Sequence, residues 1–273
     1  MNALLGLTTL PILLSAGEGS GFEAPTLEHE FDPAPFLFAG TPFEMNRIIM
    51  VRMIAALVLA AILIIYAKRA RLVPTRGQNL VEFLLNFSKE NIAEELLGAD
   101  AKRFQPLIMT IFLGVLFMNI TGVFPGLQIA GTSLIGMPLI YALVAYVGFI
   151  AAGIKAMGGR FFKEQLMPPG VPWPMYILMI PLEFFSTFIL RPVTLTVRLL
   201  ANMVAGHFIL VLCFVGTHYL YLQMGGAAGL GLGTLTLLGG IVFVIFELFI
   251  GALQAYIFAM LAASYISLSI SEH

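Results

Sequence analysis

The feature that most constrains this chain is a long interval without charge, because no Asp, Glu, Lys or Arg occurs between Arg103 and Lys155. A membrane-spanning helix needs about 20 apolar residues, so the interval is long enough for two crossings. The Gly- and Pro-containing sequence TGVFPGLQIAGTS divides it. We therefore predict one span over residues 105–123 and a second over residues 133–154, joined as a pair outside the cytoplasm.

The whole chain has the composition of a membrane protein. Hydrophobic residues make up 59% of its 273 residues, the mean hydropathy is +0.96, and only 11% of residues are charged, against about 25% in soluble domains. A net charge of −1 provides no basic surface for nucleic acid. The sequence contains no metal-ligand constellation, phosphate-binding Gly loop or nucleophile–base arrangement, so we expect no metal, no cofactor and no catalytic site of its own.

Basic loops indicate how the chain is oriented. A first span is predicted over residues 48–66, with Arg52 close enough to its end to extend toward the membrane surface. The loop KRARLVPTR follows this span, and a second basic loop begins at Lys155. Under the positive-inside rule both loops are cytoplasmic. The acidic, loop-rich residues 1–45 are then outside, and the C-terminus is cytoplasmic.

Residues 77–98 are too polar to cross a membrane, but apolar side chains recur along them at helical spacing. This pattern is typical of an amphipathic helix that lies on the membrane surface, and Gly98 is a typical residue to end it. The apolar face consists of Leu84, Phe87, Ile92 and Leu96.

The last hundred residues contain two much longer apolar stretches. The first runs for 46 residues from Trp173 to about His218, which as a helix would be roughly 69 Å long against a hydrocarbon core of about 30 Å. Either it forms two spans broken near Pro192, or it is one long, steeply tilted helix. The Gly-rich residues 225–233 are predicted to form the next turn. The second stretch then continues to Ile270.

Several polar residues punctuate these two stretches. On a helical wheel, one set falls within a band about 100° wide. The set is Glu183, Thr187, Arg191, Thr194, Arg198 and Asn202. His207 lies about 180° from Arg198, on the opposite side of the helix. In the second stretch the only charge is Glu247, and Gln254 follows it on the same face.

This inventory suits proton transfer. His207 and Glu247 are titratable, whereas Arg198 keeps its charge throughout. A fixed cation beside a mobile carboxylate favours the ionised form and so forces proton release at that point. Structural roles remain open for three other candidates: packing for Arg191, a hydrogen bond for Glu183 and an interhelical hydrogen bond for Asn119.

Two motifs contain most of these residues, ILRPVTLTVRLLANMVAGHFIL and FELFIGALQAYIFAMLAASYISLSISEH. Both resemble subunit a of the F-type ATP synthase, the membrane stator subunit that provides the proton half-channels. Shorter matches, PTRGQNLVEFLLNF and LFMNITGVFPG, extend the resemblance through most of the chain from about Asn46. The resemblance implies an all-α polytopic fold with about five membrane-embedded helices and one interfacial helix. The last two long, tilted helices would form a hairpin against the c ring.

The resemblance also implies roles for individual residues. Arg198 matches the essential arginine that separates the two half-channels and meets the ring carboxylate. His207 and Glu247 match two channel positions that hold one acid and one base, and Asn202 and Gln254 match polar positions near the arginine.

Two further positions depart from the family pattern. Glu183 matches the family's acidic residue but stands one residue further from Pro192. Where some members place an acid shortly after the residue that matches Asn119, this chain has Gly122.

The partners implied are the c-subunit ring, the peripheral-stalk b subunits, the soluble catalytic head and the lipid bilayer of an energy-transducing membrane, the bacterial plasma membrane. The chain then divides into four parts: an acidic extracytoplasmic segment 1–45, the first span with the interfacial helix 46–103, the helix pair with its cytoplasmic loop 104–172, and the tilted hairpin with the proton pathway 173–273.

Two rival functions belong to other classes. A secondary transporter with a buried ionisable substrate site would usually show inverted repeats and broken helices at the midplane, and neither pattern is found. A membrane scaffold would use its charges only for pairing.

Overall fold

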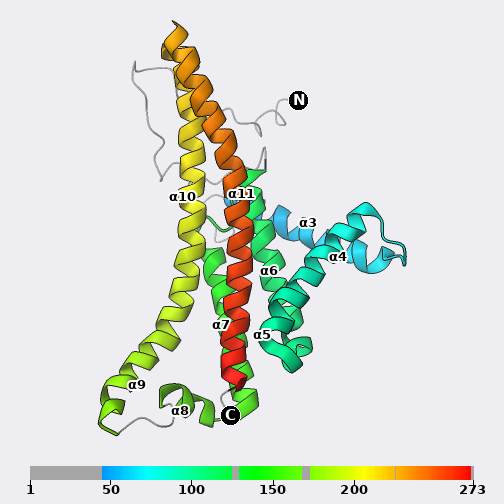
Figure 1. Ribbon diagram of the computed structural model, residues 1–273, viewed down its shortest axis with the longest axis vertical. Helices are drawn as coiled ribbons and strands as arrows, with labels where there is room; N and C mark the ends of the chain where they lie inside the picture. The colour runs from blue at the N-terminus through cyan, green and yellow to red at the C-terminus, as the bar shows by residue number, and fades with distance from the viewer. Residues whose placement is uncertain (1–44, 125–128, 168–172, 225, 272–273) are drawn as a thin grey trace.

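The computed structural model describes residues 45–124, 129–167, 173–224 and 226–271, and every regular element among them is a helix (Figure 1). Five helices in this part of the chain are long and apolar enough to cross a membrane. Their bounds are Arg47–Arg69, Arg76–Val123, Gly136–Met157, Trp173–Met224 and Gly226–Ile270. The prediction of an all-α polytopic membrane protein is confirmed. The predictions for residues 1–44 lie outside the described residues.

The first span is α3 (Arg47–Arg69), close to the predicted range. The side chain of Asn46 caps its N-terminus by accepting a hydrogen bond from the backbone N–H of Ile49 at 3.0 Å. Two basic residues occupy its last turn, where the helix dipole favours cations.

Arg52, on the second turn of α3, makes contacts within the protein that the sequence did not predict. Its guanidinium turns into the protein and donates hydrogen bonds to the backbone carbonyls of Gly131 and Leu134, at 2.8 and 3.3 Å. These acceptors are about 80 residues away in sequence, so no local pattern indicates them. The planar guanidinium group has several N–H donors, so it can bond two carbonyls of one segment at the same time.

The helix predicted over residues 77–98 is present as three consecutive segments. These are α4 (Arg76–Ser88), the π-helical η1 (Lys89–Glu94) and α5 (Glu95–Leu97). Gly98 ends them with a φ of 52°, a backbone conformation that favours glycine. The turn η2 (Gly98–Asp100) then leads into α6 (Ala101–Val123), which pairs with α7 (Gly136–Met157) and is followed by the short α8 (Arg160–Leu166).

One continuous helical run spans residues 173–224, which decides between the two alternatives left open by Pro192. Its segments are η3 (Trp173–Met175), α9 (Tyr176–Phe184), the π-helical η4 (Phe185–Leu190), α10 (Arg191–Tyr219) and η5 (Leu220–Met224). At the end of η4 the N–H of Arg191 bonds to the carbonyl of Ser186, five residues back. The π-turn directly before Pro192 alters the hydrogen-bond ladder where the proline ring would otherwise crowd it. The run bends away from the bundle at its α9 end (Figure 1).

The predicted turn over residues 225–233 is wrong beyond its first residues, because α11 (Gly226–Ser271) begins at Gly226 with a φ of 67°. The remaining glycines are helical and let α11 approach the end of the preceding run. A Cβ at Gly229 would lie 2.6 Å from the carbonyl oxygen of Leu220, and one at Gly233 would lie 2.7 Å from the ring of Tyr221. The glycines therefore close a tight hairpin between two long helices.

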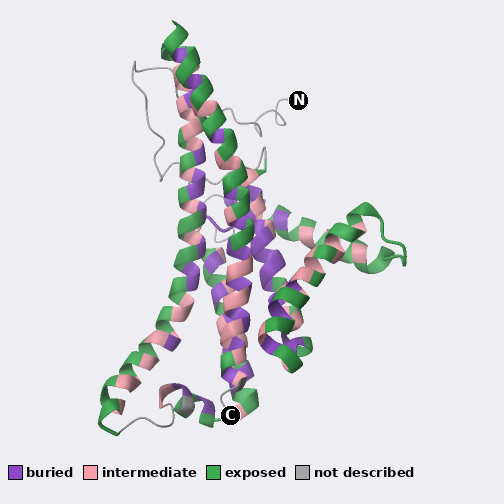
Figure 2. Ribbon diagram, in the orientation of Figure 1, coloured by how far each residue is buried: buried purple, intermediate pink, exposed green. Residues whose placement is uncertain are grey.

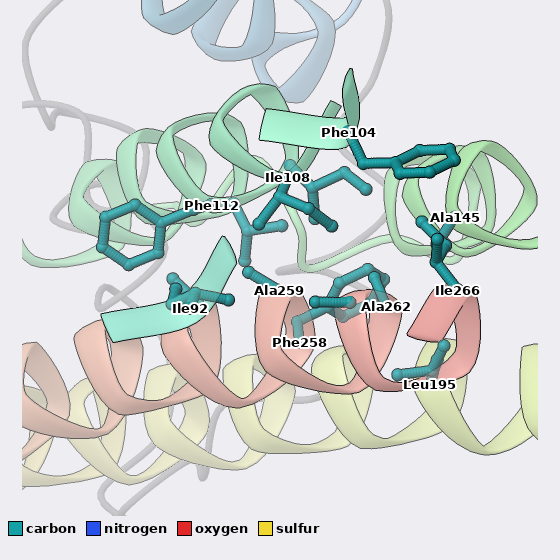
Figure 3. Packing of buried hydrophobic residues seen from close by; sticks show 14 of the residues in the cluster. Ile92, Phe104, Ile108, Phe112, Ala145, Leu195, Phe258, Ala259, Ala262 and Ile266 are labelled. Atoms are coloured by element: carbon teal, nitrogen blue, oxygen red, sulfur yellow. The ribbon is translucent and has the colours of Figure 1, made fainter. Parts of the chain in front are cut away.

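The core lies where α11 packs between α6 and α10 (Figure 3). Small residues at helical spacing on α11 are fully buried there, among them Ala255, Ala259 and Ala262. Small side chains let helices approach closely, and van der Waals packing then replaces the hydrophobic effect that is absent in lipid. Most of α3 and the outer sides of α10 and α11 remain exposed (Figure 2), as expected for surfaces that face lipid or a partner.

Candidate functional site

Arg198 lies on α10 with its side chain exposed on the outside of the helix bundle. Among the described residues it has no hydrogen bond or ion pair. Thr194 and Asn202, one turn to either side, are also exposed, as the helical wheel predicts. A permanent cation is costly in an apolar environment. Its position on the outer surface leaves the charge open to an anionic group beyond the described residues.

Asn202 and Gln254 join the two long helices one turn beyond Arg198. The amide nitrogen of Asn202 donates to Oε1 of Gln254 at 2.9 Å. Gln254 is buried with 3% of its surface exposed, and its own Nε2 has no hydrogen-bond partner in the described part of the chain. The pair holds α10 and α11 in register beside the arginine and leaves one buried donor unused.

Glu247 and His207 lie together on the inner side of the hairpin. Each is 4% exposed, and His207 is close enough to interact electrostatically with Glu247. The carboxylate packs against Gly206, where a Cβ would lie only 2.9 Å from Oε1 of Glu247. The other oxygen, Oε2, is buried without a hydrogen-bond partner among the described residues. The predicted grouping of this acid and base, on the side of α10 away from Arg198, is what the structure has.

Asn119 on α6 has both ends of its amide engaged. Its Nδ2 donates to the backbone carbonyl of Gly251 on α11 at 3.0 Å, and its Oδ1 accepts from the hydroxyl of Thr132 at 2.6 Å. Asn119 is 3% exposed. The geometry fits the interhelical hydrogen bond considered for this residue and places it beside the buried stripe of α11 that contains Glu247 and Gln254.

Arg191 sits apart from these groups at the start of α10. Its guanidinium lies over the ring of Tyr265, 4.9 Å from the centroid, and near that of Phe149, 5.6 Å from the centroid. One of its nitrogens, Nη1, is buried without a hydrogen-bond partner in the described residues. These contacts fit a packing role, one of the two interpretations open for this arginine.

Glu183, Thr187 and Arg191 do not continue the exposed side of Arg198, so the polar band predicted on the helical wheel is wrong up to and including the first residue of α10. Thr187 is fully buried and Glu183 is half-buried. The π-helical η4 explains the difference, because bonds to the fifth residue change the angular spacing that a wheel at 100° per residue assumes. The same turn lies between Glu183 and Pro192.

Two residues beside the candidate site were not singled out in the sequence. Gly206 provides the space that Glu247 occupies, and Thr132 holds the amide of Asn119. Gly206 could have been predicted, because it stands next to His207 on a helix that has to pack closely against the helix with Glu247. No comparable local signal exists for Thr132, which lies in a segment that the sequence indicates only as a turn.

Comparison with known proteins places the whole arrangement in one family. The family model described as ATP synthase A chain matches residues 48–267. The chain belongs to the ATP synthase subunit a family. A subunit a from Rhodococcus erythropolis is 45% identical over 256 residues, which cover 92% of each chain. A subunit a from Frankia alni is 38% identical over 253 residues, 90% of this chain and 85% of its own, and one from a Nocardioides species is 32% identical over 276 residues, 97% and 99%.

Membership in the ATP synthase subunit a family confirms the resemblance stated from the two motifs. The matched range includes all of α6, α7 and α10 and most of α3 and α11, so it contains every candidate residue discussed above. The assignment decides against the secondary transporter and against a scaffold whose charges merely pair.

Proposed function

We propose that this chain is the proton-translocating stator subunit of an ATP synthase, forming two half-channels that carry protons to and from a rotating c ring. The observation that supports it best is Arg198, an exposed cation on the outer side of the α10–α11 hairpin, for which the described residues offer no hydrogen bond or ion pair, in a chain of this family. A ring that presents one carboxyl group per subunit would supply the missing anion.

Arg198 would then act through its fixed charge. A protonated ring carboxyl that approaches the guanidinium is drawn toward its ionised form and releases its proton. Because a guanidinium keeps its own proton, Arg198 cannot pass protons between the two sides and so separates them. The Asn202–Gln254 bond, one turn away, fixes the part of α10 that presents the arginine.

Glu247 and His207 would relay protons in one half-channel. Both are buried and both can change charge. His207 lies nine residues after Arg198 on α10, roughly 14 Å at 1.5 Å per residue, and Glu247 packs against Gly206 beside it. This separation keeps the relay apart from the arginine. Oε2 of Glu247 and Nε2 of Gln254, which have no hydrogen-bond partner in the part of the chain that the structure describes, are polar atoms that water in such a path would bind.

Glu183 is the acid available on α9, half-buried and roughly 20 Å along the helix from Arg198. We assign it to the proton path on that side of the arginine. Arg191 and Asn119 are assigned structural roles, in packing and in helix–helix hydrogen bonding.

The remaining assignments follow from the same proposal. The partners are the c ring, the peripheral-stalk b subunits and, through the complex, the soluble catalytic head. The basic loops support a cytoplasmic location for the α3–α4 and α7–α8 connections in a bacterial plasma membrane, with the N-terminus outside. Each proton that crosses would gain about 2.3 kcal/mol per 100 mV of membrane potential, which the ring converts into rotation.

The direct test is ATP-driven proton pumping in inverted membrane vesicles that contain the complex with Arg198→Ala. We expect pumping to fall to background while the ring and the catalytic head still copurify with the chain. Arg160→Ala, which removes an exposed arginine from α8, is the matched control and should pump normally. Normal coupled pumping in Arg198→Ala would overturn the proposal.

A further inference from the structure

Residues 129–135, between α6 and α7, form an irregular segment that is mostly inside the protein. Ala130 and Thr132 have no exposed surface, and Ile129 and Ser133 are 3% and 2% exposed. Non-helical backbone among membrane helices is tolerated only where other protein groups satisfy its polar atoms. The segment therefore depends on specific partners to keep its place.

One set of partners comes from α6. The N–H of Gly131 donates to the carbonyl of Met118 at 2.9 Å and to the hydroxyl of Thr121 at 3.1 Å. That hydroxyl lies within hydrogen-bond distance of two carbonyls, those of Met118 at 2.7 Å and Ile129 at 3.1 Å. Gly131 is closely fitted, because a Cβ there would lie 2.6 Å from the sulfur of Met118. These bonds hold Ile129 and Gly131 against α6.

The carbonyl side is held from a different helix, by Arg52 of α3. Nε of Arg52 donates to the carbonyl of Gly131 at 2.8 Å, and Nη2 donates to that of Leu134 at 3.3 Å. A single side chain thus bonds both ends of a four-residue stretch. Hydrogen bonds from a charged donor are stronger than neutral ones, and the planar fork fixes direction as well as distance.

From this clamp a chain of hydrogen bonds leads to the candidate proton path. The segment presents the hydroxyl of Thr132 to Asn119, and Asn119 bonds to the carbonyl of Gly251. Gly251 lies on the buried stripe of α11, one turn after Glu247 and three residues before Gln254. Oε2 of Glu247 and Nε2 of Gln254, both buried and without a hydrogen-bond partner among the described residues, therefore flank the point where Asn119 contacts α11.

We propose that Arg52 is a positioning residue for proton transfer: by clamping residues 129–135 it holds Asn119 on Gly251 and so fixes the wall of the path beside Glu247. The inference rests on the proposed role of Glu247. It also assigns to α3, which has no candidate proton-carrying residue, a part in the geometry of that path.

The first experiment compares two substitutions of Arg52 in the assembled complex. Arg52→Met keeps most of the side-chain volume but removes every donor, whereas Arg52→Lys keeps a charged donor that can bind one carbonyl. We expect ATP-driven pumping to fall roughly tenfold in Arg52→Met. In Arg52→Lys we expect a decrease of no more than about threefold. Arg69→Met, at the exposed end of the same helix, is the matched control and should pump normally.

The second experiment reports on the segment itself. In a Cys213→Ser background, Ser133→Cys places a thiol at a position that is 2% exposed, and its labelling by a water-soluble maleimide is timed in the intact complex. We expect slow labelling with Arg52 present, labelling about tenfold faster in Arg52→Met, and an intermediate rate in Arg52→Lys.

The outcomes separate this inference from the proposed function. Unchanged labelling in Arg52→Met, unchanged pumping in that variant, or equal effects of Met and Lys would each overturn it, whatever Arg198→Ala shows. If Arg52→Met prevents assembly, Thr132→Val breaks the next bond of the chain without changing side-chain size. Thr132→Val should lower pumping in the same way, and normal pumping there would overturn the inference.

Discussion

The carboxylate of Glu247 on α11 packs directly against the backbone of Gly206 on α10, next to His207. A Cβ at Gly206 would lie 2.9 Å from Oε1, 3.1 Å from Cδ and 3.3 Å from Cγ of the acid. The two long helices thus approach closely at the acid itself, and the absence of a side chain at position 206 is what allows it. The same contact turns the acid toward His207 rather than toward the exposed side of Arg198.

This contact predicts the effect of Gly206→Ala. The added methyl group would push the carboxylate away from its position, and overpacking of this kind costs about 1–3 kcal/mol, so we expect proton pumping to fall about tenfold. Gly216→Ala is the matched control on the same helix, because no atom lies within 4 Å of a Cβ at that position. Equal pumping rates in the two variants, measured in vesicles with equal amounts of complex, would contradict the proposed geometry.

A second prediction concerns the titratable group. Glu247→Gln keeps the size and the hydrogen-bonding capacity of the side chain but cannot release a proton, so we expect passive proton flux through the membrane sector to fall at least about tenfold. The complex should still assemble, because the amide costs less to bury than a carboxylate. Glu90→Gln, an exposed acid on η1, should leave the flux unchanged. Flux measured after removal of the catalytic head would decide, and an undiminished rate in Glu247→Gln would exclude this acid from the path.

The sequence predicted the membrane helices, and it predicted which polar residues of the hairpin share a helix face. The first follow from long apolar intervals and the second from helical periodicity. Long apolar intervals in lipid must be helical, since no water is present to satisfy the backbone. Glu247 and Gln254 share a face because they are seven residues apart, and His207 lies opposite Arg198 because they are nine residues apart. All four positions lie within regular α-helix in the structure.

The predictions from the sequence were wrong or incomplete where the backbone departs from that regularity, and where contacts join residues far apart along the chain. The π-helical η4 is a matter of backbone hydrogen bonding, and no residue type near Pro192 indicates it. The sequence therefore did not predict that the helix continues past Pro192 or that the angular spacing of residues changes there. Each glycine between 226 and 233 would destabilise a helix in water by up to about 1 kcal/mol relative to alanine. In a membrane no water is present to bind the backbone N–H and C=O groups, so the helical hydrogen bonds are kept. The acceptors of Arg52 lie in a segment that pattern analysis cannot place beside α3.

The two arginines of the first motif should behave differently, and this is the third prediction. Arg191 lies over Tyr265 and Phe149, so Arg191→Met, which keeps an apolar chain of similar length, removes cation–π contacts worth about 1–2 kcal/mol. It also removes the buried Nη1 that lacks a partner among the described residues, which offsets part of that loss. We therefore expect a modest decrease in the amount or thermal stability of the complex, with the pumping rate per complex kept within about twofold.

Arg198→Met, by contrast, removes an exposed side chain and should leave stability unchanged while pumping is lost. Pumping per complex and the thermal midpoint, measured on both variants, check the distinction. If Arg191→Met also abolished pumping in a stable complex, Arg191 would belong to the proton path and its packing role would be secondary.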